Sequence, residues 1–106
     1  MNYITITTIN AYESNPLRSY SLLGRKFGIF RSKDGSYYGI ETNCKHQGAD
    51  LLQGRIVGNI VTCPWHDWRY DLSTGECLDN DSPPLRRYEI LVDGQTLKIA
   101  IVAEED

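Results

Sequence analysis

CKHQGADL at residues 44–51 and CPWHDWRYDL at residues 63–72 are the two stretches that decide how this chain folds and what it binds. Each places a cysteine just before a histidine, Cys44 before His46 and Cys63 before His66. A thiolate is a soft anionic ligand and an imidazole a neutral one, so two such pairs can hold zinc or an iron–sulfur cluster. The common zinc spacings pair cysteine with cysteine and histidine with histidine along the chain, so this order favours the cluster.

Three other uses of these side chains stay open at this point. A structural zinc site would take the same four residues. The cysteines could instead be small buried hydrophobic groups beside hydrogen-bonded histidines, as we expect for the third cysteine, Cys77. A disulfide between Cys44 and Cys63 is disfavoured, because three cysteines are an odd number and the chain shows no secretory signal.

Length and composition limit the function further. A chain of 106 residues forms one domain, with a core small enough for a bound metal to add to its stability. The formal net charge is −3 and the basic residues are scattered, which argues against a nucleic-acid partner. No apolar run approaches the roughly 18–20 residues of a membrane span, so we expect no membrane partner. Together with the cysteine count, these features predict a cytoplasmic location.

Turn residues between β-prone runs predict an all-β, antiparallel chain. Asp34-Gly35 and Asp93-Gly94 are strong hairpin signals, and Val57-Gly58-Asn59 predicts a third hairpin that hangs the two cysteine–histidine stretches from neighbouring strands. Residues 10–16 have room for one helical turn. Strands are expected at residues 3–8, 26–31, 37–41, 54–56, 60–62, 87–92 and 96–102.

Residues 43–78 resemble the Rieske family, whose pattern is Cys-x-His followed, after a hairpin, by Cys-x-x-His. The resemblance implies a single domain over residues 1–106, with an antiparallel sandwich or barrel as the base and a small cluster-binding subdomain inserted at about residues 42–72. It also implies one [2Fe-2S] cluster per chain, with Cys44 and Cys63 on one iron and His46 and His66 on the other.

The resemblance extends to residues that surround the cluster. Gln47, Gly48 and Trp65 are expected to turn backbone amides toward the bridging sulfides, and Pro83 lies where the family has a proline-bearing loop over the cluster. High-potential members carry a disulfide beside the cluster and a serine hydroxyl bonded to it. This chain has Ala49 and Trp65 at the cysteine positions.

Two aromatic positions complete this comparison. Trp68 replaces the serine of the high-potential members, and Tyr70 is kept. Losing a donor destabilises the reduced state, so a potential near the low end of the roughly −150 to +300 mV Rieske range is expected. We expect Trp68 to pack inside the protein and Trp65 to be exposed.

These features predict an electron carrier that is not itself an enzyme. Rieske oxygenases also need a mononuclear iron, but both histidines of this chain are assigned to the cluster. By resemblance, the chain takes electrons from a flavin reductase and delivers them to a terminal oxygenase or other oxidoreductase. One alternative is a fixed small subunit such as that of NADH-dependent nitrite reductase. Another, of a different class, is a structural zinc-binding interaction module.

Overall fold

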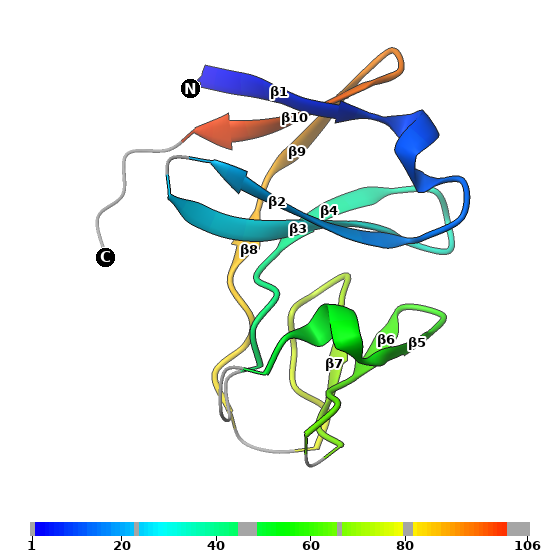
Figure 1. Cartoon of the computed structure of the whole chain (residues 1–106), viewed down its shortest axis with the longest axis vertical. Helices are drawn as coiled ribbons and strands as arrows, with labels where there is room; N and C mark the ends of the chain where they lie inside the picture. Colours follow the sequence, from blue (N-terminus) through cyan, green and yellow to red (C-terminus); the bar gives the residue numbers. More distant parts are fainter. Residues whose placement is uncertain (1, 23, 45–48, 66, 80–81, 102–106) are drawn as a thin grey trace.

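The computed structural model describes residues 2–22, 24–44, 49–65, 67–79 and 82–101. Antiparallel strands dominate it, as expected, with two short 3-10 turns (Figure 1). None of the described helical segments has the length and hydropathy of a membrane span. The elements in chain order are β1 (Asn2–Thr8), η1 (Ile9–Tyr12), β2 (Leu17–Leu22), β3 (Arg25–Arg31), β4 (Tyr37–Ile40), η2 (Leu51–Gln53), β5 (Arg55–Val57), β6 (Ile60–Thr62), β7 (Arg69–Asp71), β8 (Arg87–Tyr88), β9 (Ile90–Asp93) and β10 (Thr96–Ile101).

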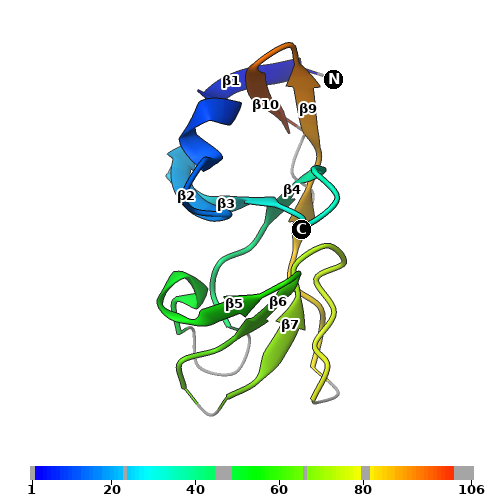
Figure 2. The same ribbon diagram turned by 90° about the vertical axis from the view of Figure 1, so that its right-hand side faces the viewer.

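Two of the three sheets form the base of the molecule. One has the strand order β1-β10-β9 and the other β2-β3-β4-β8, and they lie above the remaining strands in Figure 2. Phe27 and Ile29 of β3 share a buried cluster with Leu97 and Ile99 of β10, so apolar side chains fill the space between these sheets. Tyr12 of η1 closes the cluster from the side and is fully buried.

The third sheet, β5-β6-β7, is separate and packs below the base. Its Val61 and Tyr70 belong to a second buried cluster, which also contains Phe30 and Ile40 of the base. Strand β3 therefore buries Phe27 and Ile29 on one face and Phe30 on the other. This explains its near-continuous apolar run, which is typical of a strand covered on both faces.

The predicted hairpins are confirmed. Strand β3 pairs with β4 around Gly35, β5 with β6 around Gly58, and β9 with β10 around Gly94. All three glycines have positive φ, as tight hairpin turns require. The helical turn within residues 10–16 begins one residue earlier, as η1.

Three elements were not predicted from the sequence. Strand β2 pairs with β3, η2 follows the first cysteine–histidine stretch, and β7 pairs with β6. Each is short or half-exposed, so its local hydrophobic pattern is weak and its pairing partner decides its structure.

The inserted subdomain predicted at about residues 42–72 stays a prediction. Sheet β5-β6-β7 lies within those bounds. The chain next to β7 continues the same unit past them, because Tyr70 forms a β-bridge with Cys77 and the amide of Leu78 donates to the carbonyl of Arg69 at 2.8 Å. We therefore propose that residues 73–79 also belong to this unit.

Candidate metal centre

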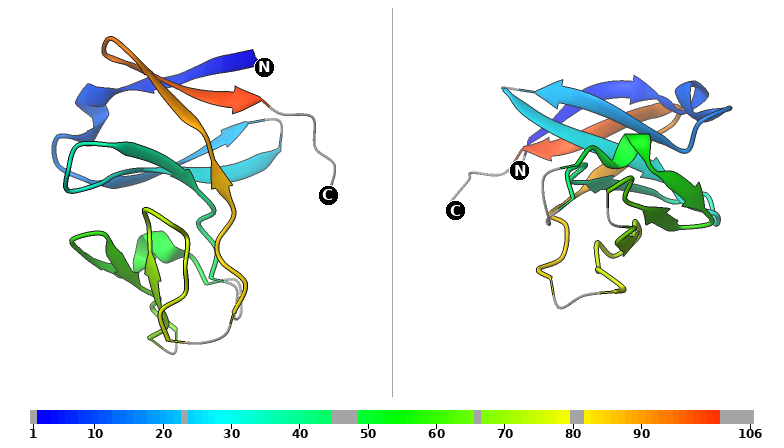
Figure 3. Two further views of the ribbon diagram at one scale, coloured as in Figure 1. Left: turned by 180° about the vertical axis from the view of Figure 1, so that it is seen from behind. Right: turned by 60° about the horizontal axis from the view of Figure 1, so that its bottom comes forward.

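The two loops that begin at Cys44 and Cys63 are closed in the same way. The Cys44 amide donates to the Ala49 carbonyl at 2.8 Å, and the Cys63 amide donates to the Trp68 carbonyl at 2.7 Å. In both loops the carbonyl belongs to the fifth residue after the cysteine. Cys63 directly follows β6, and Figures 1 and 3 show that the β5-β6-β7 sheet lies at the end of the molecule opposite the β1-β10-β9 sheet. Two matched loops on neighbouring elements thus present one cysteine each.

Both cysteines are buried and free. Cys44 is 3% exposed and Cys63 is 1% exposed, and neither forms a disulfide. The Tyr70 hydroxyl lies 3.4 Å from Cys44 Sγ, and the Trp65 amide donates to Cys63 Sγ at 3.4 Å. Each sulfur therefore has one polar hydrogen next to it, which is what a metal-bound thiolate accepts.

Burial raises the pKa of the Cys63 thiol. The Trp65 amide opposes this shift, whereas the Cys44 thiol and the Asp67 carboxylate raise the pKa further. The two thiols are thus close enough to act on each other. Two neighbouring buried sulfurs that lose their protons need a cation to balance the charge, as a metal centre provides.

The remaining predicted ligands, His46 and His66, lie outside the described residues, as do Gln47 and Gly48. Their assignment stays a prediction. The described residues next to these ligands are Cys44 and Ala49 in the first loop, and Trp65 and Asp67 in the second.

The structure also describes several other residues that the sequence analysis singled out. Trp68 is partly buried and packs against the buried cluster that contains Val61 and Tyr70, as expected. Trp65 is 52% exposed, also as expected. Pro83 is exposed, and its predicted role over the cluster stays a prediction. Cys77 is partly buried against the same core and forms an isolated β-bridge with Tyr70, which fits the small hydrophobic role expected for it.

Two supports of these loops were not predicted. The Asp50 carboxylate accepts from the Leu52 amide at 3.0 Å and so caps η2 directly after the first loop, while Lys26 approaches it at 3.5 Å. Asp79 accepts from the Arg69 amide at 2.9 Å and from the Arg69 guanidinium at 2.8 Å, which joins β7 to the chain before Pro83. An aspartate just before the first helical residue is a signal that could have identified the cap, but no sequence pattern links Arg69 to Asp79.

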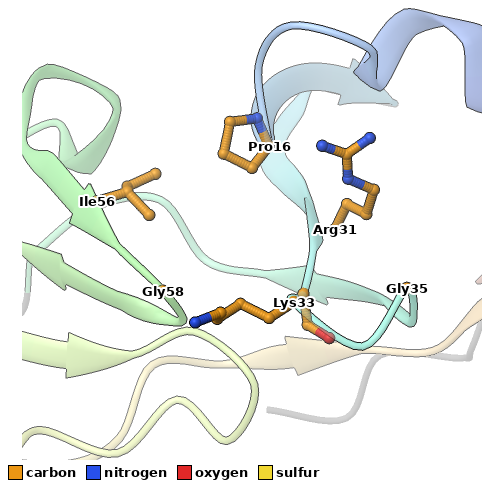
Figure 4. Close-up of a pocket in the computed structure, with 7 residues that line it drawn as sticks. Pro16, Arg31, Lys33, Gly35, Ile56 and Gly58 are labelled. Atoms are coloured by element: carbon orange, nitrogen blue, oxygen red, sulfur yellow. The ribbon is translucent and has the colours of Figure 1, made fainter.

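A crevice of about 420 Å³ separates the β3–β4 turn from the β5–β6 turn and is not part of this centre. Figure 4 shows Lys33 reaching toward Gly58 while the Arg31 guanidinium points away from it, so the two positive groups do not converge. The Lys33 amide instead donates to the Asn59 side chain at 3.1 Å. This crevice lies at the boundary between the base and the third sheet.

The comparison with protein families identifies the family to which these two cysteine–histidine stretches belong. The family described as the Rieske [2Fe-2S] domain matches residues 3–91, which include both cysteine–histidine stretches. The chain belongs to the Rieske [2Fe-2S] family. The cofactor of this family is one [2Fe-2S] cluster, and the paired buried cysteines of this Rieske chain, each beside a polar hydrogen, fit it.

Curated relatives of the Rieske chain are much longer than it is. It is 38% identical over 68 residues to the oxygenase component of 3-ketosteroid-9-alpha-monooxygenase from Rhodococcus rhodochrous, which covers 60% of this chain and 18% of that protein. The chain thus spans less than a fifth of that relative. The match is confined to one part of it.

Solved structures match the Rieske chain over nearly its whole length. The ferredoxin of carbazole 1,9a-dioxygenase from Nocardioides aromaticivorans IC177 has a TM-score of 0.82 at 25% identity, over 94% of this chain and 98% of that one. A small subunit of NADH-dependent nitrite reductase from Mycobacterium tuberculosis has a TM-score of 0.81 at 21% identity, over 97% of each chain. A carbazole 1,9a-dioxygenase ferredoxin solved in complex with its oxygenase has a TM-score of 0.81 at 22% identity, over 92% of each chain. The last two likenesses concern the fold alone.

Proposed function

We propose that this chain is a Rieske ferredoxin that carries one electron at a time between redox proteins. The observation that carries the proposal is a pair of buried, free cysteines in matched loops, within a fold that covers a dioxygenase ferredoxin almost end to end. When bound, the cluster accepts and releases a single electron. The chain itself is then a carrier within a multicomponent system and not the enzyme.

Each of the four ligands has a stated role in this proposal. Cys44 and Cys63 would hold one iron as thiolates, and His46 and His66 would hold the other through imidazole nitrogen. Tyr70 donates toward Cys44, and the Trp65 amide donates toward Cys63, so both sulfurs are stabilised as anions. The surrounding apolar core excludes water from the sulfur side of the centre.

Redox partners are proposed to dock at the end of the molecule that holds both cysteines. Trp65, two residues from Cys63, is 52% exposed there and offers a large apolar contact. A flavin reductase is the proposed donor and a terminal oxygenase the proposed acceptor, in line with the dioxygenase ferredoxin of the same fold. We further propose a cytoplasmic location, where the free thiols would stay reduced.

A second candidate is a fixed small subunit of a larger oxidoreductase. The fold of the nitrite reductase small subunit covers 97% of both chains, which favours this candidate over other complexes. A subunit would elute with a large partner from the host cell, whereas a ferredoxin would elute alone and be reduced by a separate reductase.

An anaerobic redox titration followed by electron paramagnetic resonance tests the proposal. We expect a rhombic signal with an average g value below that of the free electron, appearing at a low potential. Metal-replete protein that gives no such signal and contains zinc would overturn the carrier proposal. A signal at a potential well above zero would keep the cluster and contradict the low-potential assignment.

A further inference from the structure

Asp67 has an unusual backbone conformation at the predicted cluster loop. Its φ is +60°, and among the described residues it is the one non-glycine with positive φ. The other positive-φ positions in that part of the chain are Gly24, Gly35, Gly58, Gly75 and Gly94. Left-handed backbone suits glycine, and aspartate tolerates it at some cost. The chain thus keeps a side chain where glycine would be the relaxed choice.

The position of Asp67 places its carboxylate beside the centre. It directly follows His66, inside the turn that the Cys63 amide closes onto the Trp68 carbonyl at 2.7 Å. Asp67 is thus one residue from a predicted ligand and four residues from Cys63, within the same closed loop. The left-handed turn therefore holds one negative charge at the second ligand loop.

This charge is not neutralised by the described part of the chain. Asp79 is paired with Arg69, and Asp50 with Lys26, but Asp67 forms no ion pair with a described residue. Its side chain is exposed, so water and salt weaken its field, and only a group within a few ångströms, well inside the Debye length, feels it appreciably. An unpaired charge acts more strongly on a nearby redox group than a paired one.

We propose that the Asp67 carboxylate lowers the reduction potential of the centre in this loop. Reduction adds one negative charge to the centre, and a fixed carboxylate beside it repels that charge. This inference rests on the proposed cluster. It gives the low potential a second cause, in addition to the missing serine hydroxyl at Trp68.

Two substitutions of Asp67 separate the effect of its charge from the effect of its backbone conformation. Asp67→Asn removes the charge, keeps the shape, and tolerates positive φ. Asp67→Gly removes the charge and relaxes the backbone. Glu13→Gln is the matched control, because Glu13 is an exposed acid that follows η1 in the base. All four holoproteins, including the wild type, would be titrated and also melted thermally.

We expect both Asp67 variants to raise the midpoint potential by a similar amount, and Glu13→Gln to leave it unchanged. The expected change in the reduction equilibrium is about twofold to tenfold, where tenfold corresponds to about 59 mV for one electron. The difference should shrink as salt is added. In the melting experiment, Asp67→Gly should be more stable than Asp67→Asn.

Three outcomes would overturn the inference. They are no change in either Asp67 variant, a change in Asp67→Gly alone, and an equal change in Glu13→Gln. The first excludes an effect of the charge, the second assigns the effect to the backbone, and the third to overall charge. Failure of the proposed function looks different, because wild-type protein would then lack the rhombic signal altogether.

Discussion

The Tyr70 hydroxyl lies 3.4 Å from Cys44 Sγ, although 26 positions separate these residues in the chain. Tyr70 is fully buried on β7, and Cys44 lies four residues after the end of β4. Packing of the third sheet on the base brings them together in one buried cluster. The contact therefore links the second loop to the sulfur of the first.

Removal of this hydroxyl should lower the reduction potential. Tyr70→Phe keeps the packing but takes away a donor that stabilises the more negative, reduced state. If the reduced state lost about 1.4 kcal/mol of stabilisation, the midpoint potential would fall by about 60 mV. The measurement is a redox titration of holoprotein. Tyr12→Phe, which loses a 3.2 Å bond to Tyr20 in the base, is the control and should leave the potential unchanged.

The three cysteines should differ sharply in their effect on cofactor content. Cys44→Ser and Cys63→Ser should abolish the visible absorption and iron content of the purified protein, because each removes a proposed thiolate ligand. Cys77→Ser should keep both, since Cys77 packs against the core and lies outside the two proposed ligand loops. Iron and sulfide analysis measures the result. Loss of iron in Cys77→Ser, with the two other variants intact, would contradict the ligand assignment.

Two glycine substitutions should differ in their cost to stability. In Gly94→Ala the added Cβ would have no atom within 4 Å, so the positive φ of 62° is the sole source of strain. This substitution should lower the free energy of unfolding by roughly 1–2 kcal/mol. Gly75→Ala adds a Cβ that would lie 2.6 Å from the Leu85 carbonyl oxygen, and should cost roughly 3 kcal/mol or more. Urea denaturation of holoprotein compares them. Equal costs would show that residues 75 and 85 separate easily.

The Arg69–Asp79 pair should make stability depend on pH at the acid end. The hydrogen bond from Arg69 holds the pKa of Asp79 below its usual 3.8. A carboxyl whose folded pKa is depressed stabilises the protein above its unfolded pKa, and that contribution is lost as pH falls through the folded value. The stability difference between wild type and Asp79→Asn should thus be constant at neutral pH and shrink below about pH 4.

Denaturation curves at several pH values measure this difference. Arg69→Met should weaken this pH dependence without abolishing it, because the residue 69 amide would still donate to Asp79 and hold its pKa down. The pair is exposed, so its contribution should be small and should weaken with salt. A difference that stays constant into the acid range would mean that folding does not lower the pKa of Asp79, and would contradict the prediction.

The sequence alone determined the features that depend on near neighbours. The Asp34-Gly35 and Asp93-Gly94 turns were readable because a hairpin turn needs particular residues at adjacent positions. The candidate ligands were readable for a similar reason, since each loop carries its own cysteine and histidine within a few residues. The all-β class followed from the same local signals.

The tertiary structure decided what depends on contacts between distant segments. The Tyr70–Cys44 contact and the burial of β3 on both faces arise only when the sheets pack together, and the Arg69–Asp79 pair arises only when the chain folds back beside β7. The left-handed conformation of Asp67 is likewise set by closure of its loop, since aspartate by itself favours ordinary backbone. Local chemistry thus names the candidate ligands, whereas packing between distant segments decides what surrounds them.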